Sequence, residues 1–325
     1  MKDCCRAAWN PVRQACCALV ILRSYAKNTL RSGRCWKNAT ACRITISADL
    51  ISSLFRRGAK ERKMEHYELP LVFFTVFAQW GIGGVLALTL CQHFSSAKFS
   101  AKQQRLLALL FWIVTVTGSL ASLVHLGTPA GAYRSLVGLG KSWLSREVIA
   151  FILLNGAMFC WLALGWLKPN HYLVRILGGV TALVGLASIL VTSQVYYQMA
   201  LHPLWHTVAT PVGFLGTAVL LGFMSVAVAY SYWYNSFSAL CRGGIVLGIV
   251  LSAGALWVRY RVPGADAASP LLWWQLCASL CVTVWGVSRL RYGVHSWAWI
   301  AFIVTGELAG RMLFYSNVMS GSPWF

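Results

Sequence analysis

The sequence of 325 residues contains few charged residues, and acidic residues are the scarcest of all. Only 11% of the residues are Asp, Glu, Lys or Arg, and eight residues are acidic. Because soluble globular domains carry about 25% charged residues, this composition excludes an ordinary soluble domain. Hydrophobic residues make up 58% of the chain, and the mean hydropathy is +0.62. The composition therefore predicts an integral membrane protein with the lipid bilayer as one partner.

The sequence also lacks the motifs of common haem and metal sites. No CxxCH motif is present, and the paired cysteines near the start do not have zinc-site spacing. Cys277 and Cys281 share a helix face but do not make an iron–sulfur ligand set. Axial haem ligation needs two histidines at matched depth on facing helices, and no histidine lies in the middle of an apolar run. Haem is therefore possible but unsupported, and we expect no metal site.

Residues 1–63 differ in character from the rest of the sequence. They hold 14 Lys and Arg against three acidic residues, a net charge of +11 out of +20, and six of the eleven cysteines. Residues 64–325 carry the remaining +9, and this division of the charge between the two parts does not indicate a nucleic-acid partner. We interpret residues 1–63 as an extension from a misassigned start, with the true start at Met64. A disordered basic arm is the alternative interpretation. A zinc or redox module is the third and least favoured one.

Residues 64–325 contain eight long apolar runs separated by short polar segments. A membrane-spanning helix needs about 20 residues at 1.5 Å each, and the runs have that length, the sixth with its flanks. The sequence predicts an all-α bundle of eight transmembrane helices at 69–92, 106–126, 147–167, 174–197, 211–233, 243–258, 270–290 and 297–318. Glycines recur inside these runs, as in GIGG at 81–84, and are typical of close helix packing in lipid.

Lys and Arg are distributed unequally between the two sets of connecting loops. The loops on one side hold eight of these residues: Lys98, Lys102, Arg105, Lys168, Arg175, Arg242, Arg289 and Arg291. Those on the other side hold five: Arg134, Lys141, Arg146, Arg259 and Arg261. Because cytoplasmic loops carry the excess of positive charge, both ends of the 64–325 domain are predicted on the outer side.

Two acidic residues after position 63 belong to apolar runs and are candidates for function. Ionisable groups inside a span are costly unless paired or hydrated. Glu307 has Arg311 one helical turn further on, and the two form either a structural ion pair or a pocket wall or proton path. Glu147 opens the third run, on the same side as His125, which ends the second. His125 can accept a proton from a quinol hydroxyl and Glu147 can relay it; the alternative for His125 is a helix cap.

Five stretches resemble the membrane anchor subunit of anaerobic dimethyl sulfoxide reductase, the DmsC family. They occur in order over nearly all of the sequence after Met64 and are specific as a set. The matching stretches are ELPLVFFTVFAQ at 68–79, HLGTPAGAYRSL at 125–136, LSREVIA at 144–150, TPVGFLGT at 210–217 and TGELAGRMLFY at 305–315.

The resemblance implies an anchor in a bacterial inner membrane that holds an iron–sulfur subunit and a molybdopterin catalytic subunit. Such an anchor oxidises menaquinol and carries no haem or iron–sulfur cluster. The implied quinol-site residues are His125, Gly127, Tyr133, Arg134 and Glu147. The family's loop pattern, Pro-x-Arg-Ala-Phe, places an arginine where this sequence has Gly131, three residues before Arg134. The protein would thus be part of an oxidoreductase complex and not its catalytic centre.

Other functions remain open from the sequence. An anchor of a related N-oxide or sulfur-compound reductase would have the same overall pattern. A transporter usually shows broken helices and a repeat between its halves, and we find no clear repeat. A scaffold without quinol chemistry would tolerate loss of the His125 side chain.

Overall fold

The computed structural model describes residues 68–95, 98–125, 142–169, 171–235, 238–263, 265, 267–290 and 297–319. Within them, eight helical segments are long and apolar enough to cross a membrane, which confirms the predicted all-α bundle. The segments are α3 (Leu69–Phe94), α4 (Ala101–His125), α6 (Trp143–Leu167), α7 (Tyr172–Tyr197), α8 (Ala209–Tyr234), α9 (Ala239–Arg259), the composite of α10 (Pro270–Gln275), η3 (Leu276–Cys281) and α11 (Val282–Leu290), and α12 (Trp297–Met319). Residues 1–63 lie outside this description, so their interpretation stays a prediction.

Several helices begin earlier than the apolar runs do, because polar residues cap them. Ser100 and Gln103 form a reciprocal capping pair before α4, with the Ser100 amide donating to Gln103 Oε1 at 2.8 Å. Ser142 caps α6 by accepting a hydrogen bond from the Ser145 amide at 3.1 Å. The sequence analysis predicted that this helix starts at Glu147. Helix α6 in fact starts at Trp143, and Glu147 lies one turn inside it.

The seventh span is interrupted by a six-residue π-helix, η3, between α10 and α11. The hydropathy pattern does not predict this irregularity. Such wide turns are rare and often occur at functional positions. Here the turn brings the backbone of η3 close to α12: a Cβ atom on Gly306 would lie 2.7 Å from the Ser279 amide nitrogen. The π-helix thus places Ser279 directly against α12.

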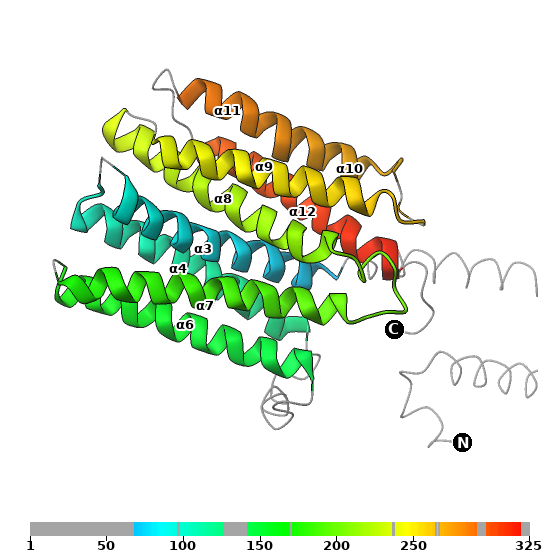
Figure 1. Ribbon diagram of the computed structural model, residues 1–325, viewed down its shortest axis with the longest axis horizontal. Coiled ribbons are helices and arrows are strands. Elements are labelled where there is room, and N and C mark those ends of the chain that lie inside the picture. Colours follow the sequence, from blue (N-terminus) through cyan, green and yellow to red (C-terminus); the bar gives the residue numbers. More distant parts are fainter. Residues whose placement is uncertain are drawn as a thin grey trace, which may run out of the picture. The chain divides into compact units, whose positions relative to one another are not determined.

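The eight spans form two groups of four, which lie side by side in Figure 1. In the first group α3 packs on α4 and α7, and α6 packs on α4 and α7. In the second group α8 packs on α9, α11 and α12, and α12 packs on α10 and η3. Helices α3 and α8 are the most buried spans and pack against each other between the groups.

The contact between α3 and α8 depends on glycine, which lets the two backbones approach closely. A Cβ atom on Gly83 would lie 1.8 Å from the Ala218 carbonyl oxygen, and one on Gly222 would lie 2.1 Å from the Gly83 carbonyl carbon. Only residues without a side chain fit at these two positions. The predicted packing role of GIGG is therefore confirmed, and we call this contact the glycine seam.

Candidate functional site

Glu147 is buried one turn inside α6, with 6% of its surface exposed. Its Oε1 atom has no hydrogen-bond partner. Thr192 of α7 faces this carboxylate closely enough to interact with it, but its hydroxyl does not meet the geometry of a hydrogen bond there. Buried polar groups are nearly always hydrogen-bonded, so two facing groups that are not are suited to exchange a proton or to bind a ligand.

Next to Glu147, two buried tyrosines link α7 to α12. The hydroxyl groups of Tyr196 and Tyr315 are 2.7 Å apart, and both tyrosines interact electrostatically with the Glu147 carboxylate. Trp205, from the segment between α7 and α8, packs on Tyr196 and donates from Nε1 to the Phe314 carbonyl at 2.9 Å. These contacts close the end of the bundle at which α3, α6, α8 and α10 begin, on the right in Figure 1.

Glu307 and Arg311 lie on the same face of α12, as predicted, and both are buried. Thr217 of α8 joins them: its hydroxyl donates to Glu307 Oε2 at 2.7 Å and accepts from Arg311 Nη2 at 3.2 Å. Ser279 of η3 donates to Glu307 Oε1, and Arg311 Nη2 also donates to Gln79 Oε1 at 2.7 Å. Both oxygens of Glu307 are therefore hydrogen-bonded inside the protein.

The arginine is also held by aromatic rings. Its guanidinium carbon lies 3.8 Å from the ring centroid of Phe214 and 5.8 Å from that of Phe314. Stacking on an aromatic face stabilises a cation that is removed from water. This environment suits a permanent charge at Arg311 within the apolar bundle.

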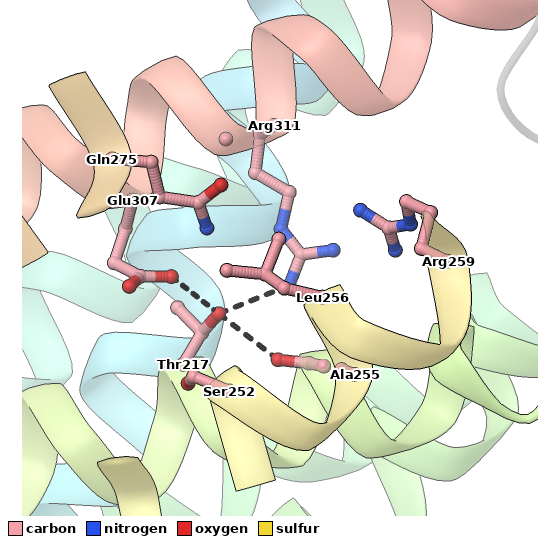
Figure 2. A pocket seen from close by; sticks show the side chains of 10 residues that line it. Thr217, Ser252, Ala255, Leu256, Arg259, Gln275, Glu307 and Arg311 are labelled. Atoms are coloured by element: carbon pink, nitrogen blue, oxygen red, sulfur yellow. Dashed lines mark hydrogen bonds between the residues drawn. The ribbon is translucent and has the colours of Figure 1, made fainter. Parts of the chain in front are cut away.

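A pocket that opens to the surface adjoins this pair, with about 350 Å³ of space not filled by atoms, part of it outside the protein (Figure 2). Helices α8, α9, α10 and α12 form its walls, and its lining residues are Gly213, Thr217, Ser252, Ala255, Leu256, Arg259, Gln275, Glu307, Gly310 and Arg311. Figure 2 shows the guanidinium groups of Arg259 and Arg311 on the same side of the pocket as Leu256. The sequence-based interpretation of Glu307 and Arg311 as a pocket wall therefore has a geometric counterpart.

The structure brings some of the predicted site residues together and leaves others undescribed. Helix α4 ends at His125 and α6 starts at Trp143, next to Glu147, at the same end of the bundle. The side chain of His125 and all of Gly127, Tyr133 and Arg134 lie outside the described residues. The quinol-site assignment of these residues stays a prediction.

The sequence interpretation missed the partners of the two carboxylates. They are Thr192, Tyr196, Thr217, Ser279 and Tyr315. It also missed Gln79, which accepts from Arg311, and Arg259, which lines the pocket. A signal was available for some: Thr192 and Tyr196 are four residues apart, and Tyr315 follows Glu307 and Arg311 at the same interval, so each set shares a helix face. The contacts between faces of different helices, such as Thr217 with Glu307, follow only from the packing.

Within the described residues, no group of three or more His, Cys, Asp and Glu side chains could hold a metal ion. His206 is engaged in a backbone contact, with Nδ1 2.5 Å from the Tyr197 carbonyl oxygen. His93 likewise contacts the Thr89 carbonyl at 2.8 Å. These two rings lie near the ends of the bundle and serve local structure.

Comparison with known proteins places the protein among membrane anchors of molybdoenzymes. Residues 63–255 match the family model described as DMSO reductase anchor subunit (DmsC). A chain of anaerobic dimethyl sulfoxide reductase from Escherichia coli is 29% identical over 281 residues, which span 78% of this sequence and 96% of the relative. The chain of the same name in Haemophilus influenzae is 36% identical over 48% of this sequence and 56% of the relative. A subunit of sulfite dehydrogenase from Allochromatium vinosum is 28% identical over 53% and 57%.

The family match extends over more than half of the sequence and includes α3, α4, α6, α7, α8 and most of α9. The eight apolar spans agree with a multi-pass protein of this kind. The chain therefore belongs to the DmsC family of DMSO reductase membrane anchor subunits.

Proposed function

We propose that this protein oxidises menaquinol and passes the electrons to an iron–sulfur partner subunit, which supplies a molybdopterin catalytic subunit. The complex would sit in a bacterial inner membrane, with both ends of the 64–325 domain on the outer side. Family membership and the eight spans support the role of anchor. The likeness to the Escherichia coli relative from anaerobic dimethyl sulfoxide reductase supports the reductase type.

The observation that carries the quinol site is the state of Glu147. It is a buried carboxylate with a free acceptor atom, Oε1, at the end of the bundle where the helix bearing His125 also ends. A general base must lie within hydrogen-bond reach of the proton it removes. A quinol head bound between the ends of α4 and α6 would present its hydroxyl to both residues.

The chemistry at this site is the loss of two electrons and two protons from each menaquinol. His125 would accept the protons of the two quinol hydroxyls one after the other, and Glu147 would relay each of them outward before the next is transferred. The electrons would leave to the iron–sulfur subunit, and menaquinone would be released. Thr192 faces Glu147 and can donate a hydrogen bond to its ionised form, while Gly127, Tyr133 and Arg134 would form the rim of the quinol pocket.

The test is quinol-analogue oxidation in membranes that carry His125→Ala, with assembly of the partner subunits measured in parallel. We expect normal assembly and a loss of quinol turnover of at least about a hundredfold, because general acid–base catalysis typically contributes that much. A matched control is His93→Ala. His93 lies in the last turn of α3, at the end of the bundle opposite to His125. Unchanged turnover in assembled His125→Ala complexes would eliminate the proposed site.

A second candidate is favoured by the similarity to the sulfite dehydrogenase subunit. In an anchor of that kind, electrons would flow from the partner subunits to the quinone, and Glu147 would donate protons to it. Incubating the complex with reduced partner subunits and menaquinone, and separately with menaquinol and an acceptor, would show which direction is faster. Faster menaquinone reduction would replace the first candidate by the second.

A further inference from the structure

The pocket between α9 and α10 has more positive charge and more free hydrogen-bond donors than the described part of the chain satisfies. Arg259 and Arg311 both line it and repel each other electrostatically. Among the described lining residues Glu307 is the one carboxylate, and it already accepts hydrogen bonds from Thr217 and Ser279. A second negative charge would relieve the repulsion between the two guanidinium groups.

Arg259 is held in place without a hydrogen-bonding partner at its Nε atom. Its guanidinium carbon lies 4.9 Å from the Phe314 ring centroid, and Nε is buried and has no acceptor. Figure 2 shows this guanidinium pointing from the end of α9 toward Arg311. A rigid set of N–H donors at this position is suited to phosphate, which guanidinium groups bind in a bidentate manner.

A second free donor faces the same space. Ser252 lies on α9, about two turns before Arg259, and is 6% exposed. Its hydroxyl lines the pocket and has no hydrogen-bond partner. The amide of Gln275 lines the opposite wall, on α10. The polar groups thus come from two helices and face the same pocket.

The surroundings of the pocket resemble the boundary between lipid and water. Trp257 of α9 and Trp273 and Trp274 of α10 are all exposed, as expected for aromatic residues at headgroup depth. Toward the start of α9, before Ser252, three exposed aliphatic residues offer an apolar surface to acyl chains: Val246, Leu247 and Val250. A ligand with a phosphate group and two hydrocarbon chains matches both the polar pocket and the exposed apolar surface of α9.

We propose that this pocket binds the phosphodiester headgroup of an anionic phospholipid, with Arg259 and Ser252 as its ligands and the acyl chains along α9. The site is separate from the proposed quinol site at Glu147, and it would tie the second group of helices to lipid of a defined charge. Free phosphate shares the chemistry of the headgroup but not the acyl chains.

The experiment uses the full-length protein, purified in a neutral detergent without phosphate. Native mass spectrometry would count retained phosphatidylglycerol and, separately, phosphatidylcholine with the same acyl chains. We expect the wild type to retain one phosphatidylglycerol in preference. Arg259→Gln should weaken this binding about ten- to a hundredfold, since hydrogen bonds to charged groups contribute that much, and Ser252→Ala should weaken it less.

Arg261→Gln is the matched control, because it removes the same charge from an exposed arginine that stacks on Trp257 outside the pocket. It should retain the lipid as the wild type does. Arg259→Lys keeps the charge and should restore part of the binding, and size-exclusion profiles would confirm that the variants fold.

Three outcomes would overturn the proposal. The first is an Arg259→Gln variant that retains phosphatidylglycerol with wild-type affinity, and the second is a wild type that binds phosphatidylcholine equally well. The third is a rise in unfolding temperature with millimolar inorganic phosphate alone that equals the rise with the lipid and depends on Arg259. The last result would assign the pocket to a free anion instead of a lipid.

Discussion

The two halves of the bundle each contain one buried glutamate, and the two differ in how their oxygens are hydrogen-bonded. Glu307 in the second half receives a hydroxyl hydrogen at each oxygen and lies beside Arg311. Glu147 in the first half has a free oxygen and faces a threonine that is itself without a partner. Both lie in spans, where an ionised group without partners is costly.

Depth separates them as well. Glu147 is four residues from the start of α6, which corresponds to roughly 6 Å along the helix axis. Glu307 is twelve residues from the end of α12, or roughly 18 Å. The deep carboxylate has a complete set of internal partners, whereas the shallow one is open. The difference indicates a structural role for Glu307 and proton exchange for Glu147.

The strongest test of this contrast compares Glu147→Gln with Glu307→Gln in quinol turnover. Removing the proposed proton acceptor should lower turnover by about a hundredfold to ten-thousandfold, while the matched change at Glu307 should have a much smaller effect. The measurement is quinol-analogue oxidation normalised to assembled complex. Equal losses in both variants would show that the two carboxylates belong to one functional unit.

The reverse contrast is expected for stability when each glutamate is replaced by leucine. Glu307→Leu leaves Arg311 buried without a nearby carboxylate and removes the acceptor of the Thr217 and Ser279 hydroxyls. A buried charge that loses its compensation in this way costs about 3 to 5 kcal/mol. Glu147→Leu removes a carboxylate that has no such partner, so its cost should be smaller. Denaturant titration of the purified protein would measure both. A larger loss for Glu147→Leu would contradict the structural role of Glu307.

The threonines beside the two carboxylates offer a finer comparison. Thr217→Val removes a donor to Glu307 and an acceptor of Arg311, and unpairing a buried polar group costs about 1 to 3 kcal/mol. Thr192→Val removes a hydroxyl without a partner and should leave the free energy of unfolding nearly unchanged. If Thr192→Val were as destabilising as Thr217→Val, the hydroxyl of Thr192 would have a partner in solution.

The smallest contrast between variants is expected at the pair of tyrosines near Glu147. Tyr196→Phe and Tyr315→Phe each remove one side of a 2.7 Å hydroxyl contact, and a hydrogen bond of this kind contributes about 1 kcal/mol. A double-mutant cycle in unfolding free energy should therefore give a coupling of about that size. Additive effects of the two substitutions would mean that the contact does not stabilise the fold.

The sequence was sufficient to predict the number and order of the spans, because long apolar runs between polar segments have few alternatives in a membrane. It was also sufficient to place Glu307 and Arg311 on one helix face, since they are four residues apart, but not to show that Thr217 bridges them. It could not predict that α6 starts at Trp143, because the Ser142 cap is a local contact at the edge of an apolar run. Nor could it predict η3, since a π-turn leaves the hydropathy pattern unchanged.

The candidate site was predictable only in part, for a physical reason. Glu147 was identified because a carboxylate is conspicuous in an apolar run. Thr192, Thr217 and Ser279 are ordinary residues of transmembrane helices, and their role depends on which helix faces lie opposite each other. That information is contained in the packing of helices far apart in the sequence and not in any single segment.

The glycine seam between α3 and α8 has a consequence for how the protein is made. Gly83 and Gly222 are separated by 222 − 83 = 139 residues. Since ribosomes add about 5 to 20 residues per second, α3 waits roughly 7 to 28 seconds after its own synthesis before α8 exists. During that interval the face of α3 around Gly83 has neither its partner helix α8 nor a side chain of its own at Gly83. The first four helices must therefore keep that face open to a late-arriving helix, and a residue larger than glycine there would fail at assembly, long after insertion.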